Sequence, residues 1–297
     1  MAGPNLQGLL DIAVPLARKA GQQSLKLRAD KLVRPTEKSA QDFVTNADKD
    51  AEYLIVDGIV AKRPSDGIMA EEGARRDSTN GITWIIDPLD GTRNFIEGNP
   101  FGVVIAAVYD SEPIASVIYL PVTDDIYSAA KDLGAKRNGR PISVKKNDAQ
   151  LDNSTVVVGQ PYDPTDAARE KQVIDKLNQY AGKTENLGAA VLGFCGVAEG
   201  TYDAYAHRGL QIWDVAAGLL IAQEAGAEIL TPFSEWLDNQ DIDSQDLVFG
   251  HPSIVADLGK AWNTSRVTSI PKLPEGLDLV TIAGQAPFSP ISNRPSL

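Results

Sequence analysis

The chain has 297 residues, 43% of them hydrophobic, which is enough for one large or two modest packed cores. It has 40 acidic and 28 basic side chains, and this excess of negative charge argues against nucleic acid as the main partner. The single cysteine excludes an intrachain disulfide framework and a cysteine-rich zinc site. No apolar run approaches the roughly 20 residues that span a bilayer, and the first residues do not resemble a signal peptide. Composition therefore predicts a cytoplasmic protein with no membrane partner.

The first half of the chain combines helical and strand patterns. Leucine and alanine recur every three or four residues over 6–28, which predicts an amphipathic helix. A second helix is predicted from Asp48 to about residue 60, and it ends before Pro64. The pair Asn138-Gly139 predicts a hairpin turn, because both residues tolerate positive φ. Runs rich in β-branched residues predict strands at 82–86, 103–109, 114–119 and 126–130.

From about residue 150, strand and helix patterns alternate. Helices are predicted at 167–180, 189–198 and 214–225, and strands at 155–158, 201–206, 228–230 and 247–249. The chain is therefore predicted to be an α/β (α+β) protein with an N-terminal lobe at 1–145 and a C-terminal lobe at 146–270. Five prolines in residues 271–297 predict an extended tail.

The segment from Trp84 to Phe95 is the most informative. A buried strand is predicted to end at Asp87, because Pro88 cannot continue a central strand, and Asp90 follows three residues later. Gly91 and Thr92 begin a turn whose backbone N–H groups can hold an anion. Two acids at the end of a strand are costly unless a cation lies between them, and hard cations such as Mg²⁺ take oxygen ligands of this kind.

Other acids stand where predicted elements begin or end. Glu71-Glu72 follows a predicted strand, and Asp48 and Asp214 stand at helix starts. Taken singly, Asp48 and Asp214 are typical helix N-caps and the glutamate pair is typical of a solvated face. Together with Asp87 and Asp90 they indicate one cation site.

Two segments resemble the signatures of the inositol monophosphatase family: Asp87-Pro88-Leu89-Asp90-Gly91-Thr92 and Trp213-Asp214-Val215-Ala216-Ala217-Gly218. Glu71-Glu72 and the segment Val44 to Asp48 match the family in order and spacing, and the resemblance covers about residues 5–230. It implies a layered αβαβα sandwich of the inositol monophosphatase / fructose-1,6-bisphosphatase type. It also implies a homodimer, an active site between the lobes, and Mg²⁺-dependent, lithium-sensitive-type phosphatase chemistry.

The resemblance also implies roles for individual residues, with two or three Mg²⁺ ions per site. The expected metal ligands are Asp48, Glu71, Asp87, the carbonyl of Leu89, Asp90 and Asp214. The expected catalytic residues are Asp48, Glu71 and Thr92, and Thr92 is the best candidate to orient or deprotonate water. The expected contacts to a small phosphorylated substrate are Asp90, Gly91, Thr92, Gly188, Ala189, Ala190 and His207.

His207 bears on the choice of substrate. Taken alone, His207 is typical of a partly exposed residue at a strand end. Inositol-specific members of the family carry a glutamate at this position, so the resemblance favours a side chain that contacts the substrate. A histidine beside Arg208 suits a second anionic group better than a diol. The expected substrate is inositol monophosphate or a related polyol phosphate. The alternatives are 3′-phosphoadenosine 5′-phosphate, fructose-1,6-bisphosphate and histidinol phosphate, and a non-catalytic regulatory homologue is the alternative from another class.

Overall fold

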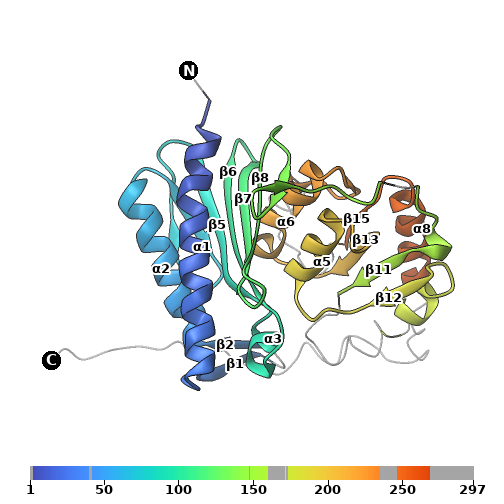
Figure 1. The fold of residues 1–297 in the computed structure, drawn as a ribbon, viewed down its shortest axis with the longest axis horizontal. Helices are drawn as coiled ribbons and strands as arrows, with labels where there is room; N and C mark the ends of the chain where they lie inside the picture. The colour runs from blue at the N-terminus through green and yellow to red at the C-terminus, as the bar shows by residue number, and fades with distance from the viewer. Residues whose placement is uncertain are drawn as a thin grey trace, which may run out of the picture.

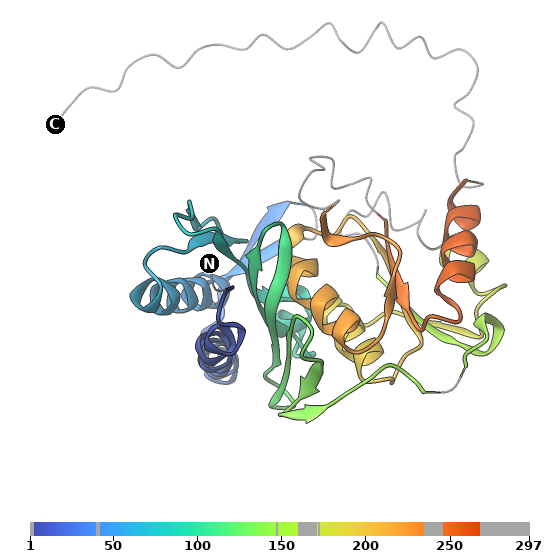
Figure 2. The same cartoon turned by 90° about the horizontal axis from the view of Figure 1, so that it is seen from above.

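The computed structural model describes residues 3–39, 42–146, 148–159, 171, 173–234 and 246–267, and the predicted tail at 271–297 lies outside them. Helices and sheets alternate in layers across the molecule (Figures 1 and 2). Helices α1 (Leu6–Ala29) and α2 (Asn46–Lys62) form the first layer, and an eight-stranded sheet forms the second. Helices α5 (Ala190–Ala198) and α6 (Ile212–Glu224) separate that sheet from a five-stranded one, which α8 (Val255–Val267) covers. The αβαβα sandwich confirms the predicted fold class.

The large sheet is a nearly continuous antiparallel run. Its order is β10-β9-β8-β7-β6-β5-β3-β4, and β3–β5 is its one parallel pair among the described residues. Asn138 and Gly139 have φ of 50° and 76°, which confirms the predicted turn. The strands are β3 (Gly67–Ala70), β4 (Arg75–Arg76), β5 (Ile82–Asp90), β6 (Gly102–Tyr109), β7 (Glu112–Leu120), β8 (Asp125–Ala130), β9 (Ala135–Arg137) and β10 (Arg140–Pro141).

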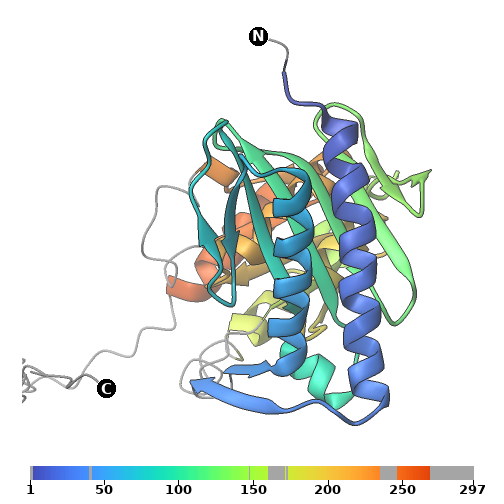
Figure 3. The same ribbon diagram turned by 90° about the vertical axis from the view of Figure 1, so that its left-hand side faces the viewer.

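Helices α1 and α2 lie side by side on the outer face of this sheet (Figure 3). The helical spacing of apolar residues in α1 brings Leu9, Ala13 and Ala17 to one buried face. They share a core with Ile55 of α2 and with Trp84 of β5, which is fully buried. This packing places the N-terminus of α2 at a fixed position relative to β5.

Strand β5 does not stop at Asp87 as predicted; it continues through Pro88 to Asp90. Asp87 pairs with Val104 and Asp90 with Gly102, so β5 has one residue more than β6 over this stretch. Such a bulge leaves a residue outside the hydrogen-bonded ladder, which is where a strand tolerates proline. The bulge keeps both aspartates on the strand and turns them toward the same region.

The small sheet has the order β12-β11-β13-β15-β14. Its strands are β11 (Thr155–Val158), β12 (Lys183–Glu185), β13 (Ala204–Arg208), β14 (Glu228–Ile229) and β15 (Asp246–Gly250). Strand β13 begins three residues later than predicted, because the N–H groups of Thr201 and Tyr202 donate to the carbonyl of Gly196 and close the end of α5. The helix predicted at 167–180 is confirmed only in part. Residues 171 and 173–177 are helical and residues 178–180 form a turn, whereas residues 167–170 and 172 lie outside the described residues.

Three further elements, β1, β2 and α3, belong to neither of these two sheets. Strands β1 (Pro35–Ser39) and β2 (Asp42–Thr45) form a hairpin that the sequence did not predict. The short helix α3 (Thr92–Glu97) follows β5. Helices α5 and α6 share one core with both sheets, including Val104 of the large sheet and Phe249 of the small one. None of the described helices is long and apolar enough to cross a membrane.

Candidate metal and phosphate site

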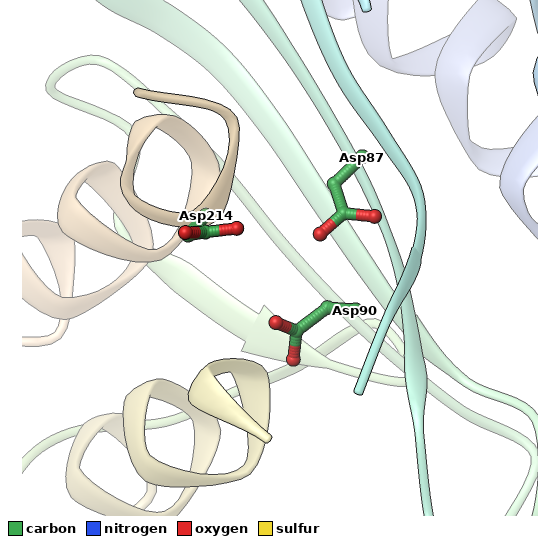
Figure 4. Close-up of side chains that lie close together, drawn as sticks. All are labelled: Asp87, Asp90 and Asp214. Atoms are coloured by element: carbon green, nitrogen blue, oxygen red, sulfur yellow. The ribbon is translucent and has the colours of Figure 1, made fainter. Parts of the chain in front are cut away.

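Three carboxylates converge at the end of β5. Asp87, Asp90 and Asp214 each offer one oxygen, and these oxygens all lie within 4.8 Å of one another. Asp87 and Asp90 come from β5 and Asp214 comes from the first turn of α6, and the three side chains face a common space (Figure 4). Asp87 and Asp90 are almost completely buried. Close oxygen ligands of this kind fit a hard divalent cation such as Mg²⁺.

The pKa values of Asp87 and Asp90 reflect their burial and, for Asp87, repulsion from the neighbouring acids. Burial raises the pKa of Asp87 well above its ordinary value, and the neighbouring charges of Glu71, Asp90 and Asp214 raise it further. Burial raises the pKa of Asp90 to about 6, although N–H groups of Val191 and Ala190 act in the opposite direction. A bound cation would relieve both the burial cost and the repulsion.

Glu71 joins this cluster through the parallel strand next to β5. It follows β3, and its N–H donates to the carbonyl of Ile86 at 3.0 Å, which continues the pairing with β5. Its side chain is hydrogen-bonded to Asp87. The carboxyl ends of two parallel strands meet at one edge of a sheet, so the pairing brings the backbone of Glu71 to the edge that carries Asp87.

Asp48 and Thr92 form a second part of the site. The Thr92 hydroxyl lies 2.9 Å from Asp48 Oδ1 and 3.2 Å from the carbonyl oxygen of Leu89. Asp48 is fully buried, and burial raises its pKa although hydrogen bonds from Thr45 and Thr92 oppose the shift. The structure thus places the hydroxyl and the carbonyl that the sequence singled out beside each other.

Asp48 and Asp214 prove to be capping residues as well as members of the site. Each is the third residue of its helix, where a carboxylate completes a capping box. Oδ2 of Asp48 accepts from the N–H of Thr45 at 2.9 Å, and Oδ2 of Asp214 accepts from the N–H of Gln211 at 2.7 Å. In Asp48 the other oxygen, Oδ1, faces Thr92. The N-cap residues themselves are Thr45 and Gln211, so the interpretation of Asp48 and Asp214 as N-caps is wrong. Their role in the capping box and a place in the site are compatible, because each carboxylate has two oxygens.

The predicted substrate loop lies directly against the turn after β5. Gly91 has a φ of 85°, and a Cβ there would lie 2.6 Å from the Cβ of Ala189, so the close approach requires glycine. Asp90 Oδ2 accepts from the N–H of Val191 at 3.0 Å, at the start of α5. The structure therefore brings Gly91, Asp90 and residues 188–190 together, and their contact with a substrate stays a prediction.

Asn94 is a residue of this region that no pattern in the sequence indicated. Its Nδ2 donates to the carbonyls of Pro100 and Leu187, both at 2.9 Å, and a Cβ at Gly188 would lie 2.3 Å from its Oδ1. It therefore links α3 to the loop before α5. An asparagine in the first turn of a helix is a weak signal, because its partner at Leu187 is distant in the sequence.

His207 lies on β13 and is 8% exposed. Its Nδ1 is 2.6 Å from the Tyr205 hydroxyl, and its ring covers Gly159, where a Cβ would lie 2.0 Å from Nδ1. One ring nitrogen thus has a partner on the same strand. Nε of the neighbouring Arg208 lies 3.9 Å from Oδ1 of Asp246. That His207 contacts substrate remains a prediction.

Comparison with known proteins places the chain in one family of phosphatases. The inositol monophosphatase family matches residues 5–271, and the chain belongs to it. The family is generally metal-dependent, which agrees with the acidic cluster.

Individual relatives carry different names. The Nus factor SuhB of Vibrio cholerae is 36% identical over 234 residues, which is 77% of this chain and 87% of that protein. The fructose-1,6-bisphosphatase/inositol-1-monophosphatase of Aquifex aeolicus is 37% identical, over 75% of this chain and 85% of that protein.

Solved structures show the same fold. The extragenic suppressor protein SuhB of Bartonella henselae superposes with a TM-score of 0.78 at 28% identity, over 86% of this chain and 98% of that one. An IMPase of Thermotoga maritima superposes with a TM-score of 0.77 at 29% identity, over 89% and 100%.

The raised carboxyl pKa values predict an unusual pH dependence of stability in the metal-free protein. A pKa of about 6 for Asp90 means that the folded protein keeps a proton that the unfolded chain, with a pKa near 3.8, releases. This contribution is present below the unfolded pKa and is lost as pH rises through 6. The melting temperature without metal should therefore fall between about pH 4 and pH 6 and level off above that range, and Asp90→Asn should reduce the slope. An equal slope in this variant would contradict the assignment.

Proposed function

We propose that this protein is a magnesium-dependent phosphomonoesterase that hydrolyses a small soluble phosphate ester. The single observation that carries the proposal is the convergence of Asp87, Asp90 and Asp214 within 4.8 Å. Glu71 beside Asp87 and the Thr92–Asp48 pair complete a set of groups suited to metal-assisted hydrolysis.

The proposed roles follow from the positions of these groups. Glu71, Asp87 and the Leu89 carbonyl would hold a first Mg²⁺, and Asp87, Asp90 and Asp214 would hold a second. Glu71 with Asp48 would hold a third, more weakly. Bound Mg²⁺ would supply charge neutralisation at the phosphate and a lowered pKa of bound water. Asp48 Oδ1 accepts a hydrogen bond from the Thr92 hydroxyl, so the Thr92 oxygen has a lone pair free to accept a hydrogen bond from an attacking water. If the water loses its proton to Thr92, the Thr92 proton would pass to Asp48. The N–H groups of Gly91 and Thr92 would bind phosphate oxygens.

The charge of the site explains how an acidic protein can take an anionic substrate. The chain carries a net charge of −12, and the proposed ligands include five carboxylates. Two or three divalent ions bring about four to six positive charges to roughly five negative ones. The loaded site would therefore be close to neutral or positive, and a phosphate dianion could enter it.

The decisive experiment is a panel of substrates assayed for phosphate release with Mg²⁺, with Ca²⁺ and with excess chelator. Mg²⁺ should be required and Ca²⁺ should inhibit, because the longer and looser coordination of Ca²⁺ disturbs in-line geometry. Full turnover in excess chelator would refute the mechanism. Inositol-1-phosphate, fructose-1,6-bisphosphate, 3′-phosphoadenosine 5′-phosphate and histidinol phosphate would rank the substrate classes. We propose inositol monophosphate or a related polyol phosphate as the leading class, and the double name of the Aquifex aeolicus relative supports including a bisphosphate.

His207→Glu should shift the choice of substrate. If the side chain reads the far end of the substrate, a glutamate would accept hydrogen bonds from a diol and repel a second phosphate. We expect the ratio of kcat/KM for inositol-1-phosphate over a bisphosphate to rise about tenfold, which corresponds to roughly 1.4 kcal/mol. An aryl phosphate should serve as control, with an unchanged rate. If both rates fall together at a constant ratio, the histidine is a packing residue that supports Tyr205 and Gly159.

The second candidate function is a non-catalytic binding role, which the name Nus factor SuhB of several relatives favours. Fluorescence anisotropy with labelled RNA, beside the phosphatase assay, separates the two candidates. We expect turnover and no tight RNA binding, because the chain has 40 acidic against 28 basic residues. Tight RNA binding without turnover would favour the second candidate.

We also propose that the protein is a cytoplasmic homodimer whose lobes are residues 1–145 and 146–270.

A further inference from the structure

The turn that carries Glu71 and Glu72 is held from one side by a buried acid of helix α2. Glu52 Oε2 accepts from the N–H of Glu72 at 2.7 Å, and Glu52 Oε1 accepts from the N–H of Ala74 at 3.0 Å. Glu52 is only 7% exposed. A carboxylate that accepts two backbone N–H bonds from one turn makes strong, directional contacts, so it determines where the turn lies relative to the helix.

Glu52 stands four residues after Asp48 on α2, and residues four apart share a helix face. The same face of α2 therefore presents Asp48 to Thr92 and Glu52 to the turn after β3. One rigid helix, α2, thus positions two separate acidic parts of the site.

The other edge of the turn has an independent anchor. The Arg75 guanidinium donates to the carbonyls of Ala70 and Ala74 and lies 5.6 Å from the centre of the Trp213 ring. Because Arg75 and the β3–β5 pairing remain when Glu52 changes, loss of Glu52 should displace the turn without unfolding it. Gly73, with a φ of 115°, stands between the two anchored amides.

We infer that Glu52 is a positioning residue that holds residues 71–74 against α2 and thereby sets Glu71 beside Asp87 for metal binding. This inference rests on the proposed function. Both oxygens of Glu52 already accept backbone hydrogen bonds, so Glu52 acts on the metal through the turn and is not itself a ligand. Groups behind a metal ligand typically contribute 10- to 100-fold to metal affinity.

The test measures Mg²⁺ binding to the full chain by calorimetry, without substrate. Glu52→Gln places an NH₂ group against a backbone N–H, and Glu52→Asp keeps the charge but withdraws the carboxylate by about 1.5 Å. Both variants should bind Mg²⁺ about tenfold or more weakly. Asp50→Asn, which removes an exposed acid of the same helix, should bind as the unaltered protein does. Hydrogen exchange of the Glu72 and Ala74 amides should accelerate in both Glu52 variants, without metal present.

The outcomes separate the possible explanations. Unaltered Mg²⁺ affinity in Glu52→Asp with loss in Glu52→Gln would mean that Glu52 contributes charge alone, and it would overturn the inference. Unaltered affinity in both variants would overturn it as well. If Glu52→Gln fails to fold, Glu52→Asp decides. If the unaltered protein binds no Mg²⁺ while the two amides still lose protection in the variants, the proposed function fails and the anchoring of the turn stands.

Discussion

Replacing Asp87 by asparagine is expected to abolish turnover while raising the melting temperature of the metal-free protein. Asp87 is proposed to contact two metal ions, and the charge stabilisation that a metal supplies is worth several kcal/mol. The rate should therefore fall by about a hundredfold or more. The same change removes a buried charge that Glu71, Asp90 and Asp214 repel, so folding without metal should become easier. Phosphate release and thermal unfolding with and without Mg²⁺ measure the two effects.

A lower rate combined with a higher metal-free melting temperature distinguishes the loss of a metal ligand from general damage to the fold. A mutation that only damages the fold lowers both the rate and the melting temperature. Asp57→Asn, an exposed acid on α2, is a matched control and should alter neither quantity. A variant of Asp87 that keeps more than about a tenth of the rate, a barrier change under roughly 1.4 kcal/mol, would contradict the proposed role. A lower melting temperature without metal would contradict the repulsion argument.

Thr92→Val is expected to lower kcat strongly with little change in Mg²⁺ affinity. Valine has nearly the same shape but lacks the hydroxyl that lies 2.9 Å from Asp48 Oδ1. Loss of a positioned proton-transfer group typically costs about 10²- to 10⁴-fold. Calorimetric Mg²⁺ titration and steady-state rates on the same preparation separate the two quantities.

Thr92→Ser provides the rescue, because it keeps the hydroxyl and should retain most of the rate. The pH–rate profile adds a second readout. If Thr92 and Asp48 take a proton from water, the valine variant should lose the acid limb that these groups produce. An unaltered kcat in Thr92→Val, or equal losses in the serine and valine variants, would show that the hydroxyl does not take part in the reaction.

Local patterns in the sequence were sufficient for much of the fold. The spacing of Leu9, Ala13 and Ala17 depends only on the helical period, and α1 (Leu6–Ala29) has almost the predicted bounds. The turn at Asn138-Gly139 depends on the φ preferences of two neighbouring residues. Asp87 and Asp90 could be selected because a carboxylate at the end of a buried strand is costly without a cation. Asp214 was selected through the resemblance of residues 213–218 to a family signature. Such signals are carried by neighbouring residues, and therefore the chain alone reveals them.

Other features exist only because distant segments meet. Strand β5 continues through Pro88 because β6 accommodates a bulge there, and no property of Pro88 itself indicates this. The contact of Asn94 with the Leu187 carbonyl joins residues 93 apart in the sequence. The contacts of Glu52 with the N–H groups of Glu72 and Ala74 join residues 20 and 22 apart. Residue types and their local patterns are enough to show which side chains could bind a cation and roughly which elements carry them. The folded chain is needed to show which oxygens face one another, because strand pairing and helix packing set distances that spacing along the chain does not contain.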